Sequence, residues 1–294
     1  MAKRASLAER RQYAHEEGSG RLKYQARLVG DRLSFDQPWV DVLAIPVALL
    51  CSLLFGSTTL GSLLLLPFQI QFHELGHASV AWLSGRAALP LPFGFTFWKE
   101  ERSLFTGACV VFLLALLLVY AVREKRPFGV LLGCLLSAAF VALSLVMSVD
   151  GSRELILLGG LSGELVFTSF ALVAFYFPLP DRLRWDFFRF LLLVPASGCW
   201  LAALRLWFGV WRGTRALPMG SIIGTDGSGD LDRLIAEYGH DQRSLAAGYG
   251  ELALWTVGVV CLVYSVFALR AWWRLRPSRR FVRRARRVGS GVHP

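Results

Sequence analysis

The chain has 294 residues, of which 54% are hydrophobic and 18% are charged, and its mean hydropathy is +0.48. A soluble globular domain has about 45–50% apolar and about 25% charged residues, so this composition excludes an ordinary soluble protein and predicts a polytopic membrane protein. The formal net charge is +11. None of the five cysteines has CxxC spacing, which argues against a disulfide framework or a thiolate metal site.

Residues 1–38 are polar and mixed in charge, and we expect a short surface helix and a linker there, with no cleavable signal peptide. The transmembrane domain is expected over residues 39–272. Its apolar segments are each near the about 20 residues that a helix needs to cross a bilayer. They are approximately residues 40–57, 60–84, 105–122, 128–149, 154–178, 187–210 and 248–272. The predicted fold class is therefore all-α, a polytopic transmembrane helical bundle of six to seven spans. Whether residues 60–84 cross fully or only dip into the membrane stays open.

Two connections between these segments carry further predictions. In residues 85–104 the stretch "FGFTFW" alternates with period two, which predicts a strand or a short hairpin at the membrane surface. Residues 211–247 form the longest loop, expected outside the membrane. Within it, "TDGSGDLDRLIAE" has the acidic spacing of a calcium loop, but Leu231 stands where that loop requires glycine. We expect instead that Asp230 caps a short helix ending at Gly239.

The basic residues indicate orientation. Residues 270–288 hold nine arginines and no acidic residue, and they follow an apolar span. We expect the Arg-rich tail, residues 273–294, to be cytoplasmic and to touch anionic lipid headgroups rather than nucleic acid. The short basic stretches 123–126 and 181–189 fall on the same side. A prokaryotic cytoplasmic membrane is the natural location.

The stretch "QFHELGHASVAW", residues 71–82, places three ionisable side chains in an apolar run, and His73 to His77 fit HExxH. On a helix, residues four apart share a face, so two imidazoles can bind one zinc ion. Zinc lowers the pKa of a bound water to about 7, and Glu74 can take the water's proton and pass it to a leaving amine. Placing an ionisable side chain in a membrane helix costs free energy, so such side chains indicate a functional site. The alternative is a histidine pair hydrogen-bonded to neighbouring helices.

The sequence "FHELGHASVAWLSGR" resembles the metal-binding helix of the site-two protease family of intramembrane zinc metalloproteases. The resemblance covers roughly residues 60–165. It implies that His73 and His77 are zinc ligands, that Glu74 is the general base and that a membrane-associated hairpin follows the helix. The family completes its site with an aspartate in an LDG motif preceded by Asn and Pro. Here the nearest match is Val149-Asp150-Gly151, without the preceding Asn-x-x-Pro.

Glu164 is the favoured third zinc ligand. It is a lone carboxylate with apolar residues on both sides, and burying it ionised without a partner costs several kcal/mol, which a zinc ion would offset. Asp150 and Asp226 are the other candidates, and a hydrogen bond to Ser or Thr, or a pair with Arg, is the other role for Glu164. Nearby glycines leave room for another helix: Gly159, Gly160 and Gly163.

The function predicted from these features is a membrane-embedded zinc metalloendopeptidase that acts on a membrane protein or peptide, with Zn²⁺ as cofactor. Two alternatives stay open. One is a non-catalytic membrane scaffold or transporter-like protein with a zinc-binding or degenerate HExxH site. The other is a membrane metalloprotease of another lineage, whose third ligand is a helix-borne glutamate.

Overall fold

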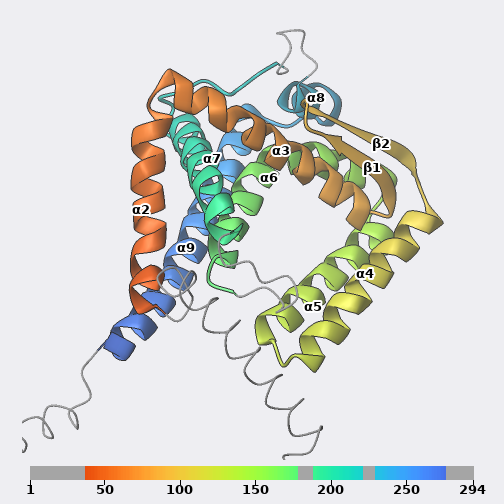
Figure 1. The fold of residues 1–294 in the computed structure, drawn as a ribbon. Coiled ribbons are helices and arrows are strands. Elements are labelled where there is room, and N and C mark those ends of the chain that lie inside the picture. The colour runs from red at the N-terminus through yellow and green to blue at the C-terminus, as the bar shows by residue number, and fades with distance from the viewer. Residues whose placement is uncertain (1–36, 178–187, 221–228, 276–294) are drawn as a thin grey trace, which may run out of the picture.

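The computed structural model describes residues 37–177, 188–220 and 229–275. Within these residues it contains eight α-helices, one π-helical turn and one two-stranded sheet, so the all-α prediction with a hairpin is confirmed. The elements, shown in Figure 1, are α2 (Pro38–Gly56), α3 (Thr59–Leu83), β1 (Arg86–Leu91), β2 (Phe95–Arg102), α4 (Leu104–Arg123), α5 (Pro127–Val141), η1 (Ala142–Val146), α6 (Val149–Ala174), α7 (Phe188–Trp211), α8 (Asp230–Tyr238) and α9 (Gln242–Leu275). The predicted N-terminal surface helix, most of the Arg-rich tail and Asp226 lie outside the described residues.

Six of these helices are long and apolar enough to cross a membrane, so this is a polytopic membrane protein: α2, α4, α5 with η1, α6, α7 and α9. The helix that carries the HExxH motif, α3, is not among them. Large apolar side chains face outward, and Leu104 and Phe105 of α4 are 95% and 79% exposed. A soluble monomer rarely exposes apolar surface on this scale, whereas a bilayer solvates it.

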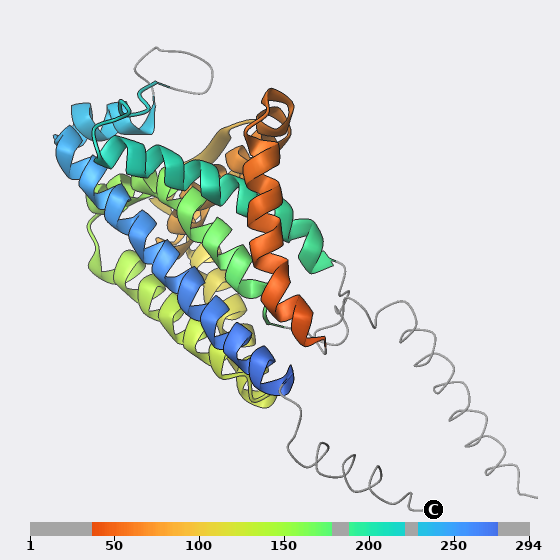
Figure 2. The same ribbon diagram turned by 90° about the vertical axis from the view of Figure 1, so that its left-hand side faces the viewer.

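Helix α6 forms the centre of the bundle. It packs against α3, α7, α8 and α9, and Leu165 and Leu172 on it are fully buried. Figures 1 and 2 show α2, α7 and α9 grouped beside α6, whereas α4 and α5 form a separate hairpin. Most of the apolar stretch of α6 is buried inside the protein, while that of α4 faces outward almost entirely. Side chains carried by α6 therefore lie in the protein interior.

The contact between α3 and α6 is a close approach of two backbones. A Cβ atom built on Gly76 of α3 would lie 2.1 Å from the carbonyl oxygen of Gly159 on α6. Only glycine permits this spacing, which is how small residues bring membrane helices together. Because Gly76 lies inside the HExxH motif, the same approach places the motif against α6.

The hairpin that follows α3 confirms the strand prediction made from "FGFTFW". Strands β1 and β2 pair antiparallel, with Ala88 opposite Trp98. The chain turns from α3 into β1 at Gly85, which has a positive φ of 75° that suits glycine. The indole Nε1 of Trp82 donates to the carbonyl of Ala88 at 3.0 Å, which fastens β1 to α3. The hairpin is thereby fixed beside the motif helix.

The short helix α8 ends as expected, with Gly239 at its C-cap in the left-handed conformation. The prediction that Asp230 caps its N-terminus is wrong. Gly229 is the N-cap residue and makes no side-chain cap, while Asp230 is the first residue of the helix. Its carboxylate contacts the motif histidines instead of the helix backbone.

Candidate metal centre

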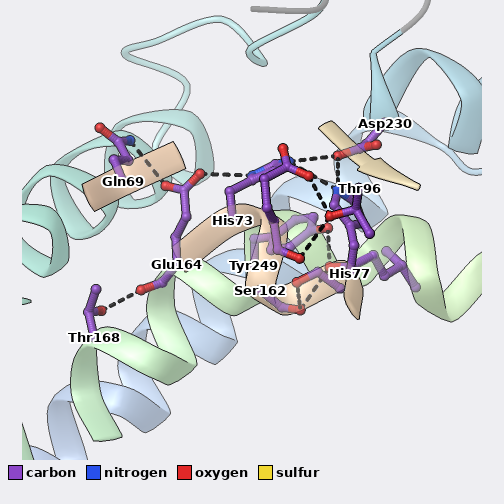
Figure 3. Close-up of polar contacts among 12 residues, drawn as sticks. Gln69, His73, His77, Thr96, Ser162, Glu164, Thr168, Asp230 and Tyr249 are labelled. Carbon is purple, nitrogen blue, oxygen red and sulfur yellow. Dashed lines mark hydrogen bonds and ion pairs between the residues drawn. The ribbon is translucent and has the colours of Figure 1, made fainter. Parts of the chain in front are cut away.

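The two motif histidines lie on one face of α3, as their spacing requires. Their rings meet edge to face with centroids 4.8 Å apart, and the Nε2 atoms of His73 and His77 are 3.1 Å from each other. Figure 3 shows both rings pointing toward Asp230, which comes from α8. The Oδ2 atom of Asp230 lies 3.0 Å from Nε2 of His73 and 3.1 Å from Nε2 of His77. Three potential ligand atoms from two distant segments thus converge.

The spacing of these three atoms fits a tetrahedral metal. Zinc binds imidazole nitrogen and carboxylate oxygen at about 2.0–2.2 Å, so its ligand atoms lie about 3.3 Å from one another. The group His73, His77 and Asp230 is the one metal-ligand cluster found among the described residues. The donor set, two imidazoles and one carboxylate with room for a fourth ligand, is that of catalytic rather than structural zinc sites.

The other nitrogen of each imidazole is held by an acceptor. Nδ1 of His73 lies 3.0 Å from Oε1 of Glu164, and Nδ1 of His77 lies 2.6 Å from the carbonyl oxygen of Ile156. The carbonyl of Ile156 assigns the proton of a neutral His77 to Nδ1, whereas His73 has a carboxylate oxygen at each nitrogen, Glu164 at Nδ1 and Asp230 at Nε2. When both rings are neutral and protonated on Nδ1, the two Nε2 atoms and the Asp230 carboxylate cannot hydrogen-bond to one another. Either added protons or a cation between the three atoms resolves this conflict.

Gly160 lets α6 pass close beside the two imidazoles. A Cβ atom at this position would lie 2.3 Å from Nε2 and 2.5 Å from Cε1 of His77, and 2.6 Å from Nε2 of His73. These distances are too short for any carbon contact. The absent side chain of Gly160 therefore leaves room for both rings to hold the positions in which their Nε2 atoms converge.

The carboxylate of Asp230 has the charge that a metal ligand needs. Burial alone would raise the pKa of Asp230; when the two imidazoles carry the added protons, their hydrogen bonds to its carboxylate outweigh burial and hold that pKa well below its usual range. The group is therefore ionised, the form in which carboxylates bind metals.

Contacts on either side of α8 hold Asp230 in place. Oδ2 of Asp232 accepts a hydrogen bond from the backbone N–H of Gly220 at 2.7 Å. Beyond the other end of α8, Nε2 of His240 lies 2.7 Å from Oε1 of Glu154 on α6. These contacts fix α8 over the N-terminal half of α6.

Glu74 lies beside the cluster and is 3% exposed. Its Oε2 atom is 2.6 Å from Oγ1 of Thr96 on β2. It lines a cavity of about 650 Å³ together with His73, His77 and Asp230. Other parts of the wall are apolar: Leu66, Ile70, Leu157, Leu161, Leu206 and Met219. The arrangement can place a bound metal, a buried carboxylate and an apolar chain segment in one chamber.

The structure brings together the motif residues expected from the sequence but places the carboxylates differently. Glu164 does not lie beside the two Nε2 atoms, as a third ligand would have to; its oxygens contact Nδ1 of His73 and the amide of Gln69. The reason is that Glu164, one turn beyond Gly160 on α6, meets His73 on the Nδ1 side of its ring, while α8 brings Asp230 to the Nε2 side. Asp150 is exposed in the first turn of α6, 3.6 Å from Arg153. Asp226 lies outside the part of the chain that the structure describes.

Asp230 is the candidate ligand that the sequence did not suggest. The signal available was its place in the cluster of acidic residues of the 211–247 loop, where only Asp226 was considered for the metal.

No protein-family model matches the chain, and no curated protein or solved structure matches it either.

Proposed function

We propose that this chain is an intramembrane zinc metalloprotease of the site-two protease type, which hydrolyses peptide bonds in or near the bilayer. The observation that carries the proposal is the convergence of His73 Nε2, His77 Nε2 and Asp230 Oδ2 in one cavity with the buried carboxylate of Glu74. The membrane-length helices around this cavity and the HELGH sequence support the same assignment.

In this proposal His73, His77 and Asp230 hold the metal, and Asp230 takes the place given to Glu164 by the sequence alone. Glu164 acts from behind, because its hydrogen bond to Nδ1 fixes the tautomer and orientation of the His73 ring. The carbonyl of Ile156 does the same for His77. Zinc, when bound, would polarise the scissile carbonyl and lower the pKa of the attacking water to about 7.

Glu74 moves the protons in the proposed reaction. Its carboxylate accepts a proton from the attacking water and delivers it to the amine of the leaving segment. Burial keeps competing solvent away from this exchange and strengthens the electrostatic interactions of the carboxylate. The apolar wall of the cavity suits an apolar stretch of a membrane protein or peptide as substrate.

The proposed location is a prokaryotic cytoplasmic membrane, with the C-terminus cytoplasmic and the Arg-rich tail on anionic headgroups. Helix α9 has 34 residues and is thus about 50 Å long, enough to cross the bilayer. Its first residue follows α8 closely, and Figure 2 shows α8 at the opposite end of the bundle from the C-terminal end of α9. The metal centre would then lie toward the non-cytoplasmic side, within reach of water.

The test of the function is the substitution Glu74→Gln, which keeps the side-chain shape but removes the base. The purified zinc-loaded protein in lipid nanodiscs is incubated with a peptide library from a digested protein extract, and new termini are read by mass spectrometry. We expect the wild type to cleave. We expect Glu74→Gln to cleave about 10²–10⁴-fold more slowly at unchanged zinc content. The exposed Glu124→Gln is the matched control and should behave as wild type.

Two results would contradict the function. A wild type that releases no new termini at full zinc occupancy is not a protease. Cleavage by Glu74→Gln at the wild-type rate would show that the hydrolysis does not depend on this site. The chain would then be a non-catalytic metal-binding membrane protein.

A further inference from the structure

We propose that Thr96, on strand β2 of the hairpin, is a positioning residue that holds the general base Glu74 in its working orientation. This inference rests on the proposed function of the site and deepens it. It assigns a role in hydrolysis to the hairpin, which supplies no metal ligand among the described residues.

The contact itself is short and directed at a charge. Oγ1 of Thr96 lies 2.6 Å from Oε2 of Glu74 and 3.0 Å from the backbone carbonyl oxygen of the same residue. A hydroxyl has one proton to donate, and a carboxylate is the stronger acceptor. The proton therefore points to Oε2, which leaves Oε1 of Glu74 as the atom that receives a proton from water.

Thr96 is the side chain through which the described part of the chain fixes this carboxylate. Within the described residues, no other side chain hydrogen-bonds to Glu74. A glutamate turns about three side-chain bonds, and a base displaced from the attacking water loses most of its effect. Without Thr96 the carboxylate would be buried but not oriented.

The position of Thr96 follows from the alternation of side chains between the two faces of strand β2. Phe97 points outward and is 65% exposed, whereas its neighbours Thr96 and Trp98 are less exposed and line the cavity. Thr96 is the polar member of this apolar stretch, and its position is where β2 passes Glu74. Figure 3 shows Thr96 beside His77 and Asp230 at the cavity.

Two anchors keep the hairpin from shifting relative to the base. The Trp82 indole holds β1 against α3. At the base of the hairpin, the fully buried Arg86 donates from Nη2 to Oγ of Ser152 at 2.7 Å and to the carbonyl of Val149 at 3.0 Å, both on α6. The hairpin is thus tied to both helices of the site, so the hydroxyl of Thr96 has a fixed place.

The test is Thr96→Val, which keeps the branched shape but removes the hydroxyl. The substrate is the library peptide that the wild type cleaves fastest. We expect kcat to fall about 10- to 100-fold, the range that loss of a hydrogen bond to a charged group gives. KM should stay within about twofold and zinc content should be unchanged. Thr96→Ser should restore kcat to within about threefold of wild type. Thr214→Val removes an exposed threonine hydroxyl and should change nothing.

The outcomes separate this inference from the proposed function. If the wild type is active and Thr96→Val retains full kcat, or if Thr96→Ser is as slow as Thr96→Val, the positioning role is wrong and the protease assignment stands. A rise in KM alone would make Thr96 a substrate contact and would also overturn the role. If Thr96→Val loses zinc or melts early, Thr96→Ser decides, because it keeps the donor. An inactive wild type overturns both proposals.

Discussion

Asp230→Ala is expected to abolish high-affinity zinc binding, while Glu164→Ala only weakens it. Asp230 places an ionised oxygen 3.0 Å from Nε2 of His73, on the side where the three ligand atoms converge. Glu164 contacts Nδ1 of the same ring. Loss of such an outer partner costs about 10–100-fold in metal affinity, and loss of a ligand costs more. The measurement is competitive titration of purified variants with a zinc-chelating dye.

Asp150→Ala is the control for this comparison. Asp150 lies on the same helix as Glu164, is exposed, and is part of the sequence that most resembles the LDG motif. The structure predicts that its removal leaves zinc affinity unchanged. If Glu164→Ala eliminates zinc and Asp230→Ala retains it, the ligand set inferred from the sequence alone is correct and the one proposed from the structure is not.

Gly160→Ala is expected to eliminate zinc without removing any ligand. The added methyl carbon would lie 2.3 Å from Nε2 and 2.5 Å from Cε1 of His77 and 2.6 Å from Nε2 of His73, so it would push both imidazoles out of the positions in which they converge on a metal. Alanine favours a helix over glycine by about 1 kcal/mol, so α6 itself should not be weakened. We expect zinc content, measured by mass spectrometry after dialysis, to fall below one tenth of the wild-type value while helical circular dichroism is retained.

The matched control is Gly258→Ala in α9, since a Cβ atom there meets nothing within 4 Å. This variant should bind zinc as the wild type does. A Gly160→Ala protein with a full complement of zinc would show that the metal does not depend on the two imidazoles in the positions that they take beside α6.

The parts of the site that the sequence predicts are those set by local periodicity. The four-residue spacing of His73 and His77 places both on one helix face whatever surrounds them. The alternation of "FGFTFW" likewise predicts the hairpin because strand side chains repeat every two residues. Length and hydropathy predict the spans, although α3, which covers the apolar segment expected at residues 60–84, is not one of the six helices that qualify.

The parts that the sequence does not predict depend on packing between distant segments. His73 and Asp230 are 157 residues apart and meet because α8 packs on α6. A lone buried carboxylate such as Glu164 signals a charged partner, but composition cannot tell which nitrogen of an imidazole it contacts. The role of Gly160 is visible only when α3 lies against α6, because the glycine acts through the side chain it lacks.

Anomalous diffraction at the zinc absorption edge, from crystals of the zinc-loaded protein, would locate the metal itself. We expect one strong peak within about 2.0–2.2 Å of Nε2 of His73, Nε2 of His77 and a carboxylate oxygen of Asp230. Glu164 should stay on Nδ1 of His73. No peak between the two histidines, or a peak bound by Glu164 with Asp230 turned away, would show that the proposed ligand set is wrong.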